Sequence, residues 1–133
     1  NYFCMKNKGY RMLAAFKNYL NFKNIEIQED DSRISFERKG LNYLFLYNRE
    51  DPVYFRLILP KVLKITENNK AQISNSVNLV NQSVKVAKAT IIDEDVWISV
   101  EQFVYSTENI EDLFDRVFLV FETFISELRN HLS

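Results

Sequence analysis

The stretch TENIEDLFDRVFLVFETFISELRNHL, residues 107–132, decides the fold of this chain. Its apolar residues recur every three or four positions, which is the spacing of one helical face. Thr107 is the expected N-cap, acidic side chains follow it, and Arg129 and His131 lie in the last turn, as the helix dipole favours. The stretch therefore predicts a long amphipathic helix whose apolar side is wide enough to cover a sheet.

The rest of the chain predicts two more helices and a series of strands. The helices are expected over about residues 5–22 and 68–82, where the apolar residues keep the helical spacing. The apolar period changes to two around residues 25–27, 34–36, 41–47, 53–59, 62–65, 84–92 and 96–105, which predicts strands. Short polar connectors imply antiparallel neighbours. Pro60 lacks an amide hydrogen, so we expect a break or bulge there and a continuation at a sheet edge.

These elements follow one another as helix, four strands, helix, two strands and helix. The expected fold class is α+β, with two layers, an antiparallel sheet and helices on one of its faces. A length of 133 residues suits one domain covering residues 1–133, and 47% of the residues are apolar, enough for a filled core.

Composition narrows the partners and the compartment. The 17 Lys and Arg residues nearly balance the 18 Asp and Glu residues, so nucleic acid is not an expected partner. No apolar run approaches the roughly 20 residues that span a bilayer, so no membrane partner is expected. The single cysteine, Cys4, favours a reducing compartment, and we expect a cytoplasmic protein. Because the chain begins at Asn1 rather than at methionine, we also expect that a short leading segment was removed.

Few residues offer catalytic, metal or cofactor chemistry. The only histidine is His131, the only cysteine is Cys4, and the chain has two glycines, so no catalytic triad, zinc site or phosphate loop can be assembled. Two acidic clusters, residues 29–31 and 93–95, lack the spacing of a calcium loop and are interpreted as hairpin tips. We expect no catalytic residue, no metal site and no cofactor.

Aromatic residues alternate with aliphatic ones in the predicted strands. If the aliphatic set faces the helices, the aromatic set faces outward and forms an apolar patch of the kind that binds proteins. The predicted protein-binding residues are Tyr43, Phe45, Tyr47, Tyr54, Trp97, Phe103 and Tyr105. The alternative is that the middle helix or the curvature of the sheet covers this second face.

The order of elements is similar to the type III secretion chaperone-like fold, and the chain resembles the YbjN-type family of small bacterial proteins. The resemblance covers most of residues 5–132. It is carried by REDPVYFRLILPKVLKI at 49–65, NLVNQSVKVAKATI at 78–91, DEDVWISVEQFVY at 93–105 and the closing amphipathic helix. It implies a cytoplasmic, often dimeric protein that binds or regulates other proteins, and it does not imply an enzyme.

Three functional hypotheses follow. The first is a non-enzymatic, chaperone-like or regulatory module that binds an unknown protein partner and forms a homodimer through its sheet or middle helix. The second is a small-molecule binder or minor enzyme with a pocket between sheet and helices lined by Tyr19, Tyr43 and Tyr105. The third is a structural domain of a larger assembly.

Overall fold

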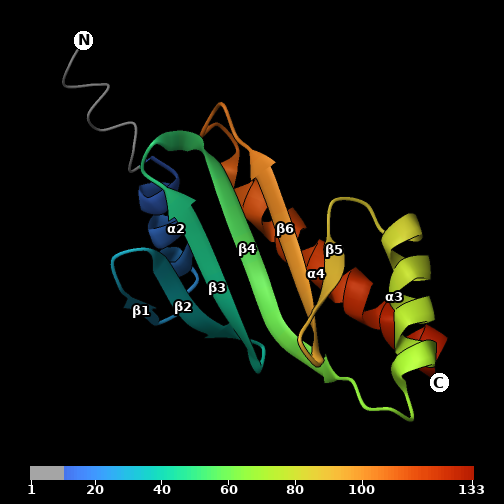
Figure 1. Ribbon diagram of the computed structural model, residues 1–133. Helices are drawn as coiled ribbons and strands as arrows, with labels where there is room; N and C mark the ends of the chain where they lie inside the picture. The colour runs from blue at the N-terminus through green and yellow to red at the C-terminus, as the bar shows by residue number, and fades with distance from the viewer. Residues whose placement is uncertain (1–10) are drawn as a thin grey trace.

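The computed structural model describes residues 11–133, which form three helices and one six-stranded sheet (Figure 1). The elements are α2 (Arg11–Phe22), β1 (Ile27–Glu29), β2 (Arg33–Arg38), β3 (Leu41–Asn48), β4 (Asp51–Lys64), α3 (Lys70–Ser83), β5 (Lys88–Ile92), β6 (Asp95–Phe103) and α4 (Ile110–Leu132). This order confirms the prediction. The first half of the expected helix over residues 5–22, and Cys4, lie outside the described residues.

The sheet has the strand order β1-β2-β3-β4-β6-β5, and every neighbouring pair is antiparallel. Helices α2 and α4 lie on one face of the sheet, behind it in Figure 1, while α3 stands beside the β5 edge. The two-layer α+β architecture is therefore as predicted. Within residues 11–133, none of the helices combines the length and the apolar content needed to cross a bilayer.

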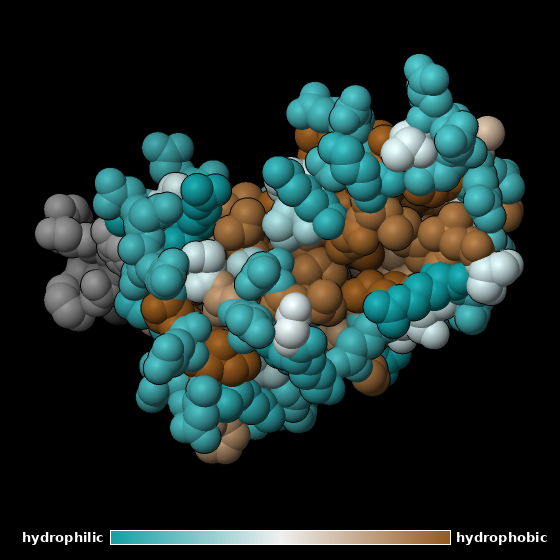
Figure 2. All heavy atoms as spheres, turned by 90° about the horizontal axis from the view of Figure 1, so that it is seen from below, coloured by the Kyte–Doolittle hydropathy of each residue, from teal (hydrophilic) through white to brown (hydrophobic). Residues whose placement is uncertain are grey.

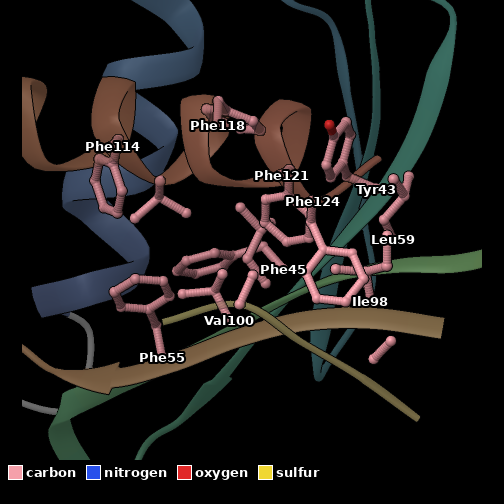
Figure 3. Packing of buried hydrophobic residues seen from close by; sticks show 14 of the residues in the cluster. Tyr43, Phe45, Phe55, Leu59, Ile98, Val100, Phe114, Phe118, Phe121 and Phe124 are labelled. Atoms are coloured by element: carbon pink, nitrogen blue, oxygen red, sulfur yellow. The ribbon is translucent and has the colours of Figure 1, made fainter. Parts of the chain in front are cut away.

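The core fills the space between the sheet and helices α2 and α4, and it is rich in aromatic rings (Figure 3). Phe16 of α2 stacks on Phe45 of β3, with ring centroids 4.1 Å apart. Phe118 of α4 meets Tyr43 of β3 edge to face at 5.2 Å. Because aromatic pairs add to the energy of apolar burial, these contacts fix both helices on the sheet.

Helix α4 begins at Ile110, so the prediction of Thr107 as its N-cap is wrong. Asn109 precedes the helix in the left-handed conformation, with φ of 57°, which asparagine tolerates better than most residues. The carbonyl of Thr107 accepts a hydrogen bond from the Ile110 amide at 3.2 Å, which forms a turn before the helix. The side chain of Thr107 therefore does not cap α4.

A bulge interrupts β4 at Pro60, as predicted. Beyond it Leu63 and Lys64 pair with β6 alone, because the pairing with β3 ends at Ile58, so the predicted continuation at an edge is also confirmed. The ladder with β6 jumps from Leu59 opposite Ile98 to Leu63 opposite Val96. The intervening residues leave the ladder, so Pro60 does not need the amide hydrogen that it lacks. This part of β4 can therefore accommodate a proline.

Asn81 attaches α3 to the edge of the sheet. Its side-chain amide donates to the carbonyl of Ala89 at 3.0 Å, and its carbonyl oxygen accepts from the Ala89 amide at 2.7 Å. Ala89 belongs to the edge strand β5, whose outer backbone groups would otherwise lack a neighbouring strand. The side chain of Asn81 thus replaces one residue of that missing strand.

An ion-pair cluster joins the turn between β2 and β3 to α4. The Glu122 carboxylate accepts from Lys39 Nζ and from Arg38 Nη1, both at 3.1 Å. The Arg38 guanidinium also lies 4.4 Å from the centre of the Phe118 ring. The hydrogen bond from Lys39, with that from Arg38, holds the pKa of Glu122 below its usual value.

This cluster predicts a pH-dependent contribution to stability. Because the pKa of Glu122 is lower in the folded state, its charge stabilises the fold above the unfolded pKa of about 4.5, and this contribution is lost as the pH falls through the folded value. We expect Glu122→Gln to lower the free energy of unfolding by up to about 1 kcal/mol at neutral pH. In urea titrations the difference from the wild type should vanish near about pH 3.

A matched control is Glu127→Gln on the same helix, because Glu127 makes no ion pair with the described residues. It should change stability little at either pH. A Glu122→Gln deficit that is as large at pH 3 as at pH 7 would contradict the assignment.

Candidate functional site

The candidate site is the sheet face that points away from α2 and α4, hereafter the open face. In the part of the chain that the structure describes, no helix lies over it, because α3 contacts the β5 edge and α4 instead (Figure 1). The middle helix therefore does not cover this face, which was the alternative to an exposed aromatic surface.

An aromatic ridge occupies one end of the open face, where β4 begins and β6 ends. The ring centroids of Tyr54 and Phe103 are 6.2 Å apart, and those of Phe103 and Tyr105 are 6.4 Å apart. Phe103 is 60% exposed and Tyr105 is 75% exposed. Two large, adjoining aromatic side chains in water are typical of an interface rather than of a stable free surface.

Tyr54 is the anchored member of this ridge. Its hydroxyl donates to the Glu101 carboxylate at 2.7 Å. Partial burial, followed by this hydrogen bond, raises the pKa of Tyr54 to about 12, so its hydroxyl stays a protonated donor at neutral pH. The hydrogen bond fixes the orientation of one ring and so preorganises the ridge.

The centre of the open face is apolar but contains unpaired polar atoms. Leu44, Ile58 and Ser99 are cross-strand neighbours there. Arg56 Nε and Trp97 Nε1 are covered by neighbouring atoms and have no hydrogen-bond partner among the described residues. A covered, unpaired donor costs roughly 1–3 kcal/mol. Such costs are typical of surfaces that serve binding rather than stability.

The predicted outward orientation of Tyr43 and Phe45 is wrong. Both are buried in the core, at 1% and 0% exposure, and Tyr47 packs against the same core at its margin. The reason is the register of the β2–β3 hairpin, which sets Tyr43 opposite Phe36 and Phe45 opposite Ile34. Cross-strand partners share a face of the sheet, so the aromatic set of β3 follows β2 into the core.

The sequence contains a signal for this orientation. Lys39 and Gly40 form a two-residue turn between β2 and β3, and Gly40 has a φ of 79° that glycine adopts easily. A two-residue turn sets the pairing of the whole hairpin, so the face of Phe36 also decides the face of Tyr43. In β4 and β6 the predicted orientation is correct, because Tyr54, Trp97 and Phe103 lie on the open face and alternate with core residues. The prediction did not include Leu44, Leu46 and Ile58, which lie on the same face.

The tyrosine pocket predicted between sheet and helices is not formed by its three residues. Tyr19 and Tyr43 both pack against Phe118 inside the core, with ring centroids 6.1 and 5.2 Å from it. Tyr105 is exposed on the open face instead. Burial raises the pKa of Tyr19, whose hydroxyl donates to Asp115 at 2.5 Å, so this side chain belongs to the packing of α2 on α4.

The acidic clusters lie where turns were predicted. Asp30 accepts hydrogen bonds from the amides of Ser32 and Arg33 and so closes the β1–β2 turn. Asp93 has a φ of 55° in the β5–β6 turn. His131 is exposed in the last turn of α4. Among residues 11–133, no three His, Cys, Asp or Glu side chains are grouped to hold a metal ion.

Comparison with solved structures identifies the fold. The chain is similar to YbjN, a candidate transcription regulator from E. coli, with a TM-score of 0.66 over 90% of this chain and 93% of that one, at 11% identity. It is also similar to an uncharacterised protein from Methanothermobacter thermautotrophicus, with a TM-score of 0.57 over 94% and 99% of the two chains, at 9% identity. No protein-family model and no curated protein sequence matches. The chain therefore has a YbjN-like fold.

Proposed function

We propose that this chain is a non-enzymatic, chaperone-like regulatory module that binds proteins, including a second copy of itself, through the open face. The observation that carries the proposal is the aromatic ridge, in which Phe103 and Tyr105 are mostly exposed beside the anchored Tyr54. Trp97 lies on the same face at the other end of β6, beside the edge strand β5. Aromatic residues of this kind supply much of the energy at protein interfaces.

Two further observations support a binding role over catalysis. The fold is shared with YbjN, a candidate transcription regulator, which suggests a regulatory role. The chain has one histidine, at the exposed end of α4, which leaves little for catalysis. Its single cysteine bears on the compartment instead and suits a reducing one such as the cytoplasm. We therefore propose a cytoplasmic homodimer whose subunits associate through the open face, which is also the face proposed to bind another protein.

Self-association tests the proposal directly. At tens of micromolar, sedimentation velocity should show a dimer for the wild type. Phe103→Glu places a charge in the centre of the ridge and should weaken the dimer at least about tenfold, because a buried, unpaired carboxylate is costly. The matched control is Phe22→Glu on α2, since Phe22 is 68% exposed but lies outside the open face.

The two parts of the proposal can fail separately. A wild type that sediments as a monomer contradicts the homodimer. The binding of another protein then rests on capture from native lysate, in which a bound protein should be lost with Phe103→Glu and kept with Phe22→Glu. Equal capture by both variants would contradict the role of the open face.

A further inference from the structure

A second site lies away from the open face, on the underside of the molecule as drawn in Figure 1. A hollow of about 270 Å³ forms there, where the β2–β3 turn, the β4 bulge and the last turns of α4 meet. Figure 2 shows this region from below, with apolar surface around a depression. The apolar walls come from Leu41, Leu59, Val62, Leu63, Ile125 and Leu132.

The bulge in β4 shapes one wall of the hollow. Pro60, Lys61 and Val62 leave the ladder between β4 and β6, and all three line the hollow. Lys61 has a φ of 53°, a left-handed conformation that a lysine adopts only at a cost. The bulge that accommodates Pro60 thus also gives this hollow one of its walls.

Three cationic side chains stand at one side of this hollow, and one of them, Arg129, has no partner in the part of the chain that the structure describes. Arg129 lines it and also lines a neighbouring polar hollow that contains Arg38, Lys39 and Glu122. Arg129 makes no ion pair or hydrogen bond with any of residues 11–133. Together Arg38, Lys39, Arg129 and Glu122 carry a net charge of +2. This exceeds the roughly half negative charge that the helix dipole places at the C-terminus of α4. The polar hollow therefore attracts an anion.

A covered donor without a partner in residues 11–133 lies beside the same region. The Tyr43 side chain lines the polar hollow, and its hydroxyl has no hydrogen-bond partner among the described residues. In Figure 3 this hydroxyl points away from the rings of Phe121 and Phe124. Burial raises the pKa of Tyr43, so the group stays a donor at neutral pH. Because this hydroxyl is covered, the group that can meet an anion at the surface of the hollow is Arg129.

We propose that the two adjoining hollows bind a free medium-chain fatty acid, with the alkyl chain among the aliphatic walls and the carboxylate at Arg129. The guanidinium can bind a carboxylate with two parallel hydrogen bonds. A volume of about 270 Å³ lies just below the roughly 300–1,000 Å³ of common ligand sites, which suits one short chain rather than a two-chain lipid. An apolar protein side chain would use the aliphatic walls but leave Arg129 without a partner.

Titration of the intact protein with decanoate, below the concentration at which decanoate aggregates, tests this proposal. Calorimetry should show saturable binding at one site. Octanoate should bind about fifteenfold more weakly, because it lacks two methylenes and each buried methylene tightens binding about fourfold. Arg129→Gln should weaken decanoate about tenfold and leave decanol unchanged, since decanol lacks the charge. Leu132→Trp fills the hollow and should abolish both.

Matched controls lie on the same helix, outside the hollow. Arg116→Gln repeats the charge change and Leu119→Trp repeats the size change, and both residues line a different surface beside α3. Both controls should bind decanoate as the wild type does. Failure of decanoate to bind, equal losses for decanoate and decanol with Arg129→Gln, or binding only to phosphatidylglycerol vesicles would each overturn the proposal. None of these outcomes bears on the open face.

Discussion

Replacing Phe118 by alanine is expected to lower the free energy of unfolding by about 3–5 kcal/mol. The Phe118 ring is fully buried, and it contacts the rings of Tyr43 and Phe36 on the sheet at 5.2 and 6.0 Å. It also lies under the Arg38 guanidinium. Alanine would leave a cavity where α4, β2 and β3 meet. Since a domain of this size is stable by roughly 5–15 kcal/mol, the loss is a large share of the total.

The control for this variant is the adjacent residue. Leu119→Ala changes the same helix one position further on, but Leu119 is 53% exposed and points away from the sheet. Its cost should stay below about 1 kcal/mol. Urea unfolding followed by circular dichroism measures both, and an unchanged m-value shows that the unfolded states are comparable. Equal losses for the two variants would contradict the packing described for α4.

Replacing Asn81 by alanine is expected to cost about 2 kcal/mol, because two backbone groups of Ala89 lose their partners in a partly buried site. The amide of Ala89 should exchange with solvent faster than in the wild type. An exposed β5 edge should also make the variant more prone to associate at high concentration. Urea unfolding measures the loss, and hydrogen exchange followed by NMR locates it at β5.

Asn78→Ala is the matched control, because Asn78 lies on the exposed side of the same helix. Alanine has a higher helix propensity than asparagine, so this variant should be as stable as the wild type or slightly more stable. If Asn81→Ala and Asn78→Ala have the same stability, the two hydrogen bonds to Ala89 contribute nothing measurable, and the other contacts of α3 with α4 and β5 hold it in place.

Much of the fold could be predicted from local patterns. Helix α4 keeps its apolar spacing over 23 residues, and the alternation in β4 and β6 continues long enough to assign faces. The boundaries were less accurate where side chains compete for the backbone. Ser106 accepts from the amide of Glu108, and Asn109 adopts a left-handed conformation, so the helix begins later than Thr107. Such local competition is not visible in the apolar pattern.

The candidate sites were harder to predict. The outward orientation of Trp97 and Phe103 follows from the alternation in β6. The inward orientation of Tyr43 does not follow from alternation, because both residue sets of β3 are apolar and only the pairing with β2 decides between them. The fatty-acid site was not predicted at all. Its walls come from residues 40–63 and 125–132, which are far apart in the chain, and no local motif connects them.

The sequence by itself determined the order of the elements, the apolar faces of α2 and α4, and the shortage of catalytic side chains, because these depend on composition and on periodicity within one segment. Tertiary structure decided which face of β3 became core, which strands flank the bulge at Pro60, and that Arg129 was left without a partner among the described residues. Each of these depends on pairing between distant segments, where the burial of one surface settles the exposure of another.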